Sequence, residues 1–233
     1  MPQEQKKAVP ADEKNIAVLE LQSVIVKTMC NLIEYPNDMT MEHVERTQRY
    51  VSLLVEEMMH MGVYRDVLNS WDIEIFLQSV PLHDVGKIAI HDSILMKPVS
   101  LTVEEFTEMK KHTIIGEMII EKMQQNIRET ASLTESASFT GSAFLTHAKI
   151  IAGTHHEKWD GTGYPRGIAG VKIPLQGRLM AIADVYDALI SDKPYKGAFS
   201  IDEAVQIIKA GNGVYFDPAL ADVFLAAARR FQG

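Results

Sequence analysis

Apolar residues recur at helical spacing along almost the whole chain, which limits the folds open to it more than any other feature. Helices are expected over 16–33, over 44–62 and over 71–84, where Pro81 should introduce a kink. Outside an insert at 124–142, no segment shows sustained two-residue alternation with β-branched residues. The pattern predicts an all-α fold, a helical bundle with one core and no internal repeat.

Capping signals locate further helix starts in the second half of the chain. Thr102 with Glu105 forms a capping box that opens a helix expected to end near residue 123, after an irregular connection over 88–101. Ser200 with Glu203 is a second capping box, and Asp217-Pro218 pairs an N-cap with a proline at the first helical position. Helices are also expected over 143–156 and 175–191, on either side of a long glycine-rich loop at 157–175.

Composition narrows the class of protein. Residues 1–15 are polar and are expected to be a flexible tail or a linker remnant, with one domain over 16–233. The start is no secretory signal, and no stretch reaches the 18 or more apolar residues of a membrane span. The single Cys30 fits a reducing cytoplasm. The net charge of −8 argues against broad nucleic-acid binding.

Two pairs of metal-ligating side chains, His83-Asp84 and His155-His156, lie at expected helix ends. A helical bundle could bring them together with inward-facing side chains of other helices. Histidine and carboxylate without cysteine favour Fe, Mn or Zn in a hydrolytic role over a structural zinc site. The further candidate ligands are His43, His112 and Asp184, whereas His60, His91 and His147 are expected on the solvated surface or satisfied in the core.

Three stretches carry a resemblance to a known family. The first is His83-Asp84-Val85-Gly86-Lys87. The second is His155-His156-Glu157-Lys158-Trp159-Asp160-Gly161-Thr162-Gly163-Tyr164-Pro165. The third consists of Ala183-Asp184-Val185-Tyr186-Asp187-Ala188-Leu189 together with Lys193-Pro194-Tyr195-Lys196. Together they closely resemble the HD-GYP family of cyclic di-GMP phosphodiesterases, a branch of the HD superfamily of metal-dependent phosphohydrolases. The resemblance extends from about residue 41 to 224, nearly the whole chain.

The resemblance implies a metal centre in the core of the bundle. Asp84 would bridge two metal ions, and His43 would bind a third ion in members that hold three. The glutamate that partners this histidine in such members is replaced here by Met39, whose thioether is a poor ligand for a hard metal. Two ions are therefore expected, Fe or Mn first, with Zn, Ni, Mg or Co as alternatives. The implied ligands are His83, Asp84, His112, His155, His156 and Asp184. His43 would be either a weak extra ligand or a residue that supports the ligands through a hydrogen bond without binding metal.

The activity that the resemblance implies is hydrolysis of cyclic di-GMP to linear pGpG by a metal-bridging hydroxide. Further hydrolysis to GMP stays open, because Met39 replaces the glutamate expected for a third ion. Asp84 and Lys87 are the expected catalytic residues, with Lys87 near the phosphate or a metal-bound water. Lys193 and Lys196 match positions that hold substrate phosphates in the family, although a solvated charge pair is the alternative. Tyr164 is expected either to contact substrate by stacking or hydrogen bonding, or to be purely structural.

Supporting roles fall to a second aspartate and to the glycine-rich loop. Asp187 lies one helical turn after Asp184 and is expected to orient a histidine or the loop. In the family, the loop corresponding to 160–165 shapes the substrate pocket. It also offers a docking surface to protein partners such as a diguanylate cyclase, here through Gly161–Pro165.

The insert at 124–142 carries Ser or Thr at every second position from Thr130 to Ser142. It is expected to be a mobile loop or a short extended excursion that could contact a partner. Helix geometry places it far from the metal layer, because Met123 and Ala143 lie roughly 16 and 18 Å along their helices from His112 and His155.

Two other functions stay open from the sequence. One is a catalytically weak receptor or adaptor that binds cyclic dinucleotides, against which the intact set of ligands argues. The other is a hydrolase of a different cyclic dinucleotide or of a nucleotide monophosphate. The metal, the end product, the regulatory input and the oligomeric state are not determined by the sequence.

Overall fold

The structure is a computed structural model that describes residues 24–30, 41–134, 141–192 and 197–232. Met39, Lys193, Lys196 and the expected tail at 1–15 lie outside these residues. The described residues are all-α, as predicted, with one isolated bridge between Asn212 and Phe216 and no strand. None of their helices is both long and apolar enough to span a membrane.

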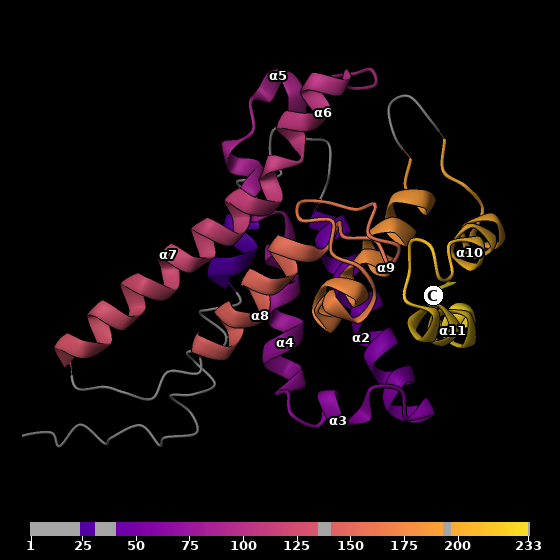
Figure 1. Cartoon of the computed structure of the whole chain (residues 1–233), viewed down its shortest axis with the longest axis horizontal. Coiled ribbons are helices and arrows are strands. Elements are labelled where there is room, and N and C mark those ends of the chain that lie inside the picture. The colour runs from indigo at the N-terminus through magenta and orange to yellow at the C-terminus, as the bar shows by residue number, and fades with distance from the viewer. Residues whose placement is uncertain (1–23, 31–40, 135–140, 193–196, 233) are drawn as a thin grey trace, which may run out of the picture.

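The helices follow the expected order (Figure 1). Residues 24–30 are helical, and the capping boxes at Thr102 and Ser200 and the cap at Asp217 form as expected. The further elements are α2 (Met41–Met61), α3 (Arg65–Leu68), α4 (Ile73–Ser79), η1 (Val80–Ala89), α5 (Asp92–Leu95), α6 (Val103–Met109), α7 (Lys111–Thr134), α8 (Gly141–Thr154), η2 (Gly170–Lys172), α9 (Leu175–Ile190), α10 (Ile201–Ala210), α11 (Pro218–Ala227) and η3 (Ala228–Gln232).

The helix expected over 71–84 ends early. The α-helix α4 stops at Ser79, and the chain continues as the ten-residue 3₁₀ helix η1 with Pro81 in its first turn. Proline has no backbone N–H for the α-helical hydrogen bond, so a change of helix type at this point has a local cause. His83 and Asp84 therefore lie within a 3₁₀ segment, a type of structure that is rarely this long. The connection expected to be irregular over 88–101 also contains the short helix α5.

The prediction for the insert was wrong over its first part. Residues 124–134 continue α7, and the helix expected to run from residue 102 to 123 is divided at Lys110 into α6 and α7. Met123 and Ile127 pack against the buried Ile120 and its neighbours, so an apolar stripe extends past the expected helix end. Residues 135–140 lie outside the described residues.

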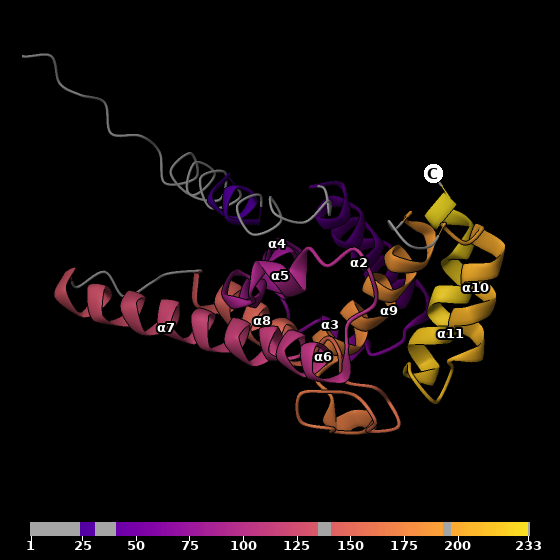
Figure 2. The ribbon, with the colours of Figure 1, turned by 90° about the horizontal axis from the view of Figure 1, so that it is seen from above.

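The end of α7 lies far from the metal-ligating residues, as the sequence predicted for the insert. At about 1.5 Å per residue, Thr134 lies about 33 Å along α7 from His112. Figures 1 and 2 show this end of α7 extending beyond the other labelled helices, on the side opposite α10 and α11.

The core consists of two buried clusters rather than the single core expected from sequence. The larger one lies among α2, α9, α10 and α11 and includes Leu54, Tyr186 and Phe224. The smaller one joins η1, α7, α8 and the 24–30 helix and includes Val85 and Ile120. The candidate metal ligands come from helices that contribute to both hydrophobic clusters, so the site lies where these two parts of the core meet.

Candidate metal centre

The candidate ligands come from five elements. His83 and Asp84 lie in η1, His112 in the first turn of α7, and Asp184 in α9. His155 and His156 occupy the turn directly after α8, where the helix has ended. His43 lies in the first turn of α2. The elements converge because η1 packs against α2, α7 and α8, and α9 packs against α2 and α8.

The structure divides these residues into two clusters, in each of which the potential ligand atoms lie within 4.8 Å of one another. We call them the first cluster, made of Asp84, His112, His155 and His156, and the second cluster, made of His43, His83 and Asp184. All six residues of the predicted set are present. His43, which the sequence left between two roles, lies beside His83 and Asp184 as a full member of the second cluster.

Asp84 faces both clusters. Its Oδ1 atom lies 3.3 Å from His112 Nε2 and 3.7 Å from His155 Nε2, and its Oδ2 atom lies 3.2 Å from His83 Nε2. Oδ1 is buried and receives no hydrogen bond from the described residues. A buried carboxylate oxygen without a hydrogen bond is costly unless a cation compensates it. Each oxygen of Asp84 therefore faces the histidines of one cluster, and a cation in the first cluster would compensate Oδ1.

Backbone carbonyls set the orientation of three histidines. Nδ1 of His83 lies 3.1 Å from Val80 O, that of His112 lies 2.7 Å from Met109 O, and that of His155 lies 3.0 Å from Ile151 O. A carbonyl only accepts, so each Nδ1 carries a proton, and in the neutral ring the Nε2 lone pair points into the cluster. Such hydrogen bonds are the usual support of a metal-ligating histidine.

The Nε2 atoms of the histidines converge on one another as well as on Asp84. Nε2 of His112 lies 3.4 Å from that of His155, and Nε2 of His43 lies 3.4 Å from that of His83. Two facing lone pairs repel each other unless a proton or a cation lies between them. The donor set and its geometry thus fit a divalent ion in each cluster.

His43 is held by Asp187, which the sequence singled out as a supporting residue. His43 Nδ1 lies 2.8 Å from Asp187 Oδ2. Arg46, which sequence reasoning missed, donates from Nε to Asp187 Oδ1 at 2.6 Å and from Nη2 to Oδ2 at 3.0 Å. Its position three residues after His43, on the same face of α2, is the signal that could have revealed it.

The electrostatics of the first cluster favour the neutral forms of His112 and His156. Burial lowers the pKa of His112 to about 4 and that of His156 well below its usual value. Burial alone would raise the pKa of Asp84, but Lys87 and His83 outweigh it and hold this pKa well below the usual range. Histidines must be neutral and the aspartate ionised to bind a metal ion, so the protonation states of His112, His156 and Asp84 suit metal binding at neutral pH.

His83 in the second cluster behaves differently. Burial would lower its pKa, but the charge of Asp84 outweighs this and raises the pKa to about 9. Without an ion, His83 is therefore protonated at neutral pH and shares its proton with Asp84. An ion in the second cluster would replace that proton.

Of the predicted substrate-contact residues, the structure describes Lys87 and Tyr164, and both lie beside the first cluster. Lys87 Nζ lies 2.5 Å from Asp84 Oδ2. The Tyr164 ring lies 4.7 Å from that of His156 and 6.4 Å from that of His112, measured between ring centres. Burial raises the pKa of the Tyr164 phenol, which keeps it protonated and able to donate a hydrogen bond. Their contacts with substrate stay predictions.

Close backbone approaches set the distances within the centre. A Cβ at Gly86 would lie 1.9 Å from His112 O, so only glycine lets η1 lie this near to α7. A Cβ at Gly163 would lie 2.3 Å from Lys158 N, which makes glycine necessary in the loop as well. The buried Glu157 accepts hydrogen bonds from the backbone N–H groups of Arg166 and Ile168 and so closes the loop on itself.

A buried ion pair, which sequence reasoning also missed, attaches the loop to the C-terminal helices. Arg178 donates to Asp217 Oδ2 at 2.5 Å and to Tyr64 Oη at 3.0 Å, and its guanidinium lies 5.9 Å from the centre of the Trp159 ring. The backbone N–H groups of Trp159 and Asp160 donate to Tyr215 O and Val214 O. Arg178 and Asp217 lie 39 residues apart in the chain, so no local sequence pattern reveals the pair.

The remaining histidines lie away from the clusters, as predicted. His60 and His91 are exposed. His147 is buried beside Trp71 and Phe76, and its Nδ1 lies 3.2 Å from Gln176 Nε2.

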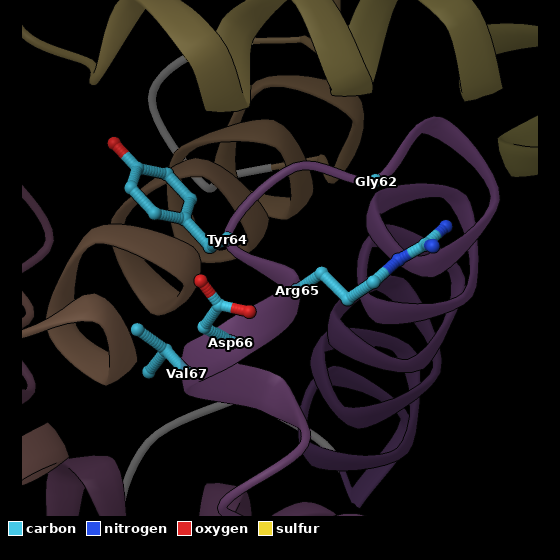
Figure 3. Close-up of a pocket in the computed structure, with 5 residues that line it drawn as sticks. All are labelled: Gly62, Tyr64, Arg65, Asp66 and Val67. Carbon is cyan, nitrogen blue, oxygen red and sulfur yellow. The ribbon is translucent and has the colours of Figure 1, made fainter.

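A surface cavity lies apart from the metal centre. It measures about 510 Å³ and is lined by Gly62, Tyr64, Arg65, Asp66 and Val67 at the turn between α2 and α3 (Figure 3). No lining residue belongs to either cluster. It has no identified role in the chemistry of the centre.

Known proteins give the family of this chain. The family model described as "HD domain" matches residues 27–220. A cyclic di-GMP phosphodiesterase from Vibrio cholerae is 46% identical over 210 residues, which cover 90% of this chain and 40% of that protein. A 3'3'-cGAMP-specific phosphodiesterase from the same organism is 35% identical and is matched over 88% of this chain and 35% of its own length. This chain thus spans less than half the length of these relatives.

The fold has relatives among solved structures. A HDG"Y"P protein from Bdellovibrio bacteriovorus superposes with a TM-score of 0.54 at 18% identity, over 82% of this chain and 52% of its own. At this identity the likeness concerns the fold alone. With the family match, it confirms the fold class predicted from the sequence. The chain therefore belongs to the HD domain family, and its resemblance to the HD-GYP branch of that family is confirmed.

Proposed function

We propose that this domain is a metal-dependent phosphodiesterase that opens cyclic di-GMP to linear pGpG. The observation that carries the proposal is the position of Asp84 between the two clusters, with one carboxylate oxygen facing the histidines of each. A pair of ions bridged by a carboxylate is a common arrangement for hydrolysis of phosphodiesters. The similarity to phosphodiesterases acting on cyclic dinucleotides supports the choice of substrate.

The ions, when bound, would polarise the phosphate and lower the pKa of a coordinated water. Nitrogen and carboxylate ligands without cysteine suit Fe or Mn in this role. Asp84, His112, His155 and His156 would hold one ion, and His43, His83 and Asp184 the other. A third ion, and with it further hydrolysis to GMP, would need a ligand near Met39, which lies outside the described residues.

Residues beside the first cluster would bind the anionic substrate. Lys87 lies beside Asp84 and contributes a positive charge where the phosphate would lie. Tyr164 retains its proton and can donate a hydrogen bond to a phosphate or ribose oxygen. Lys193 and Lys196 stay predictions for phosphate binding, as do docking of a protein partner on Gly161–Pro165 and a cytoplasmic location.

A second candidate is hydrolysis of a mixed guanine–adenine cyclic dinucleotide. The 35% identity to a 3'3'-cGAMP-specific phosphodiesterase favours it. The metal chemistry would be the same, because both substrates present the same phosphodiester. The difference would lie in the residues that contact the bases.

The test compares wild type with Asp84→Asn and with Asp66→Asn, which removes an exposed carboxylate that belongs to neither cluster. Each protein is purified anaerobically, its bound metal is measured, and cyclic di-GMP, cyclic di-AMP and 3'3'-cGAMP are followed by chromatography. We expect wild type and Asp66→Asn to form pGpG from cyclic di-GMP, and Asp84→Asn to lose both metal and activity.

The outcomes separate the functions. Preferred turnover of 3'3'-cGAMP would favour the second candidate. Bound metal and tight nucleotide binding without turnover would show a receptor and overturn the proposal. Activity that persists in Asp84→Asn would contradict the assignment of Asp84.

A further inference from the structure

Helix α6 lies directly against the first cluster. Its last residue, Met109, accepts the hydrogen bond from His112 Nδ1 at 2.7 Å. Phe106 and Lys110, the residue that follows α6, are one turn apart and share a face. The Phe106 ring lies 6.1 Å from that of Tyr164, which in turn lies 4.7 Å from that of His156. A continuous series of ring contacts therefore leads from the cluster to α6.

This series follows the accessible side of the cluster. Asp84, His112 and His155 are buried, whereas His156 and Tyr164 are only partly buried. Phe106 at the outer end is 46% exposed. A ligand whose phosphate reached the first cluster past His156 would meet Tyr164 and then Phe106.

Lys110 adds hydrogen-bond donors to this aromatic surface. Its Nζ atom lies 5.2 Å from the ring centre of Phe106 and 5.9 Å from that of Tyr164. Among the described residues, no carboxylate lies within ion-pair distance of Lys110. The neighbouring cations are paired, Lys97 with Glu105, Lys111 with Glu108 and Arg166 with Glu117.

We propose that Phe106 and Lys110, with Tyr164, bind one nucleobase of the substrate and select guanine over adenine. This inference rests on the proposed function. An aromatic face stacks on any base, so Phe106 would contribute affinity without selectivity. A lysine donates to the O6 and N7 acceptors of guanine, whereas adenine presents an amino donor in place of O6. Lys110 would therefore supply the discrimination.

The experiment uses two variants with matched controls on the same surface. Phe106→Ala is paired with Val103→Ala, an apolar residue of α6 that is 79% exposed. Lys110→Met is paired with Lys111→Met, the adjacent lysine that is paired with Glu108. Metal content is measured in each protein, and KM and kcat are determined for cyclic di-GMP and cyclic di-AMP. Affinities of the metal-loaded proteins for GMP and AMP are measured by calorimetry.

We expect Phe106→Ala to raise KM about tenfold for both dinucleotides with an unchanged kcat. Lys110→Met should lower the preference for cyclic di-GMP over cyclic di-AMP, and for GMP over AMP, by about tenfold. The controls should match wild type in KM, base preference and metal content.

Two outcomes would overturn the inference. Equal losses for guanine and adenine ligands in Lys110→Met would show that Lys110 binds phosphate rather than a base. An unchanged KM in Phe106→Ala would show that the Phe106 ring does not stack on a base of the substrate. If wild type hydrolyses no cyclic dinucleotide, the proposed function fails, but the GMP and AMP affinities still decide whether Lys110 selects guanine.

Discussion

His43 Nδ1 lies 2.8 Å from Asp187 Oδ2, and Arg46 donates hydrogen bonds to both oxygens of the same carboxylate. Asp187 thereby fixes the ring of a residue in the second cluster without belonging to either cluster. Burial would raise the pKa of Asp187, but His43 and Arg46 outweigh it and lower this pKa, so the carboxylate stays ionised. The arrangement makes the second cluster dependent on a residue outside it.

Asp187→Asn should weaken metal binding in the second cluster by about 10- to 100-fold, because His43 loses its charged partner. It should also destabilise the fold by about 1–3 kcal/mol, since the bonds to Arg46 lose their charge assistance. Metal titration and urea denaturation measure the two effects. The control Asp222→Asn alters an exposed aspartate and should leave both unchanged. Wild-type metal affinity in Asp187→Asn would contradict the role.

Metal binding to the second cluster should depend on pH through His83. Its pKa of about 9 in the ion-free protein lies above neutral pH, so an ion must displace a proton. The apparent affinity should therefore fall as the pH drops below about 9, by up to about tenfold per pH unit. Mn²⁺ titrations between pH 6.5 and 9 test this. His60→Gln, which changes an exposed histidine, should keep the same slope. A pH-independent affinity would refute the shared proton.

Gly86→Ala should disrupt the centre from the backbone. The new Cβ would lie 1.9 Å from His112 O, so η1 and α7 must separate. We expect a loss of about 2–4 kcal/mol of stability together with loss of bound metal. Gly197→Ala is the control, because a Cβ there meets nothing within 4 Å. Calorimetric melting and metal analysis are the measurements, and retention of metal by Gly86→Ala would show that the contact is unimportant.

The ion pair of Arg178 and Asp217 should be strongly coupled. Arg178→Met leaves a buried carboxylate without its partner, which costs about 3–5 kcal/mol. The double variant Arg178→Met with Asp217→Asn should recover part of this loss, because no unpaired charge remains. A double-mutant cycle by urea denaturation measures the coupling. The cycle in which Arg65→Met and Asp66→Asn replace exposed neighbours should show almost none.

Ile127→Ala tests the correction to the insert. If residues 124–134 are helical and Ile127 packs on the smaller core cluster, the variant should lose about 1 kcal/mol without change in bound metal. Arg128→Ala, on the exposed side of α7, should be neutral. Thermal melts distinguish the two. Equal stability of both variants would favour the loop that the sequence suggested.

Local patterns predicted what depends on near neighbours. The capping boxes at Thr102 and Ser200 involve residues three apart, and both form as expected. The helix over 124–134 was missed because alternating Ser and Thr residues obscured a stripe continued by Ile127. At Pro81 the sequence predicted a kink, whereas the structure shows a change from an α-helix to a 3₁₀ helix. The length of η1 depends on packing against α7 at Gly86, which no local pattern contains.

The sequence alone determined which residue types are available to the centre, because adjacent pairs such as His83-Asp84 and His155-His156 carry their chemistry wherever the chain places them. Only the tertiary structure decided how they are shared between two clusters, and that His43 completes the second one. The division depends on which direction each Nε2 and each oxygen of Asp84 faces. Those directions follow from contacts between helices far apart in the chain, whereas sequence periodicity reports only on neighbours along one helix.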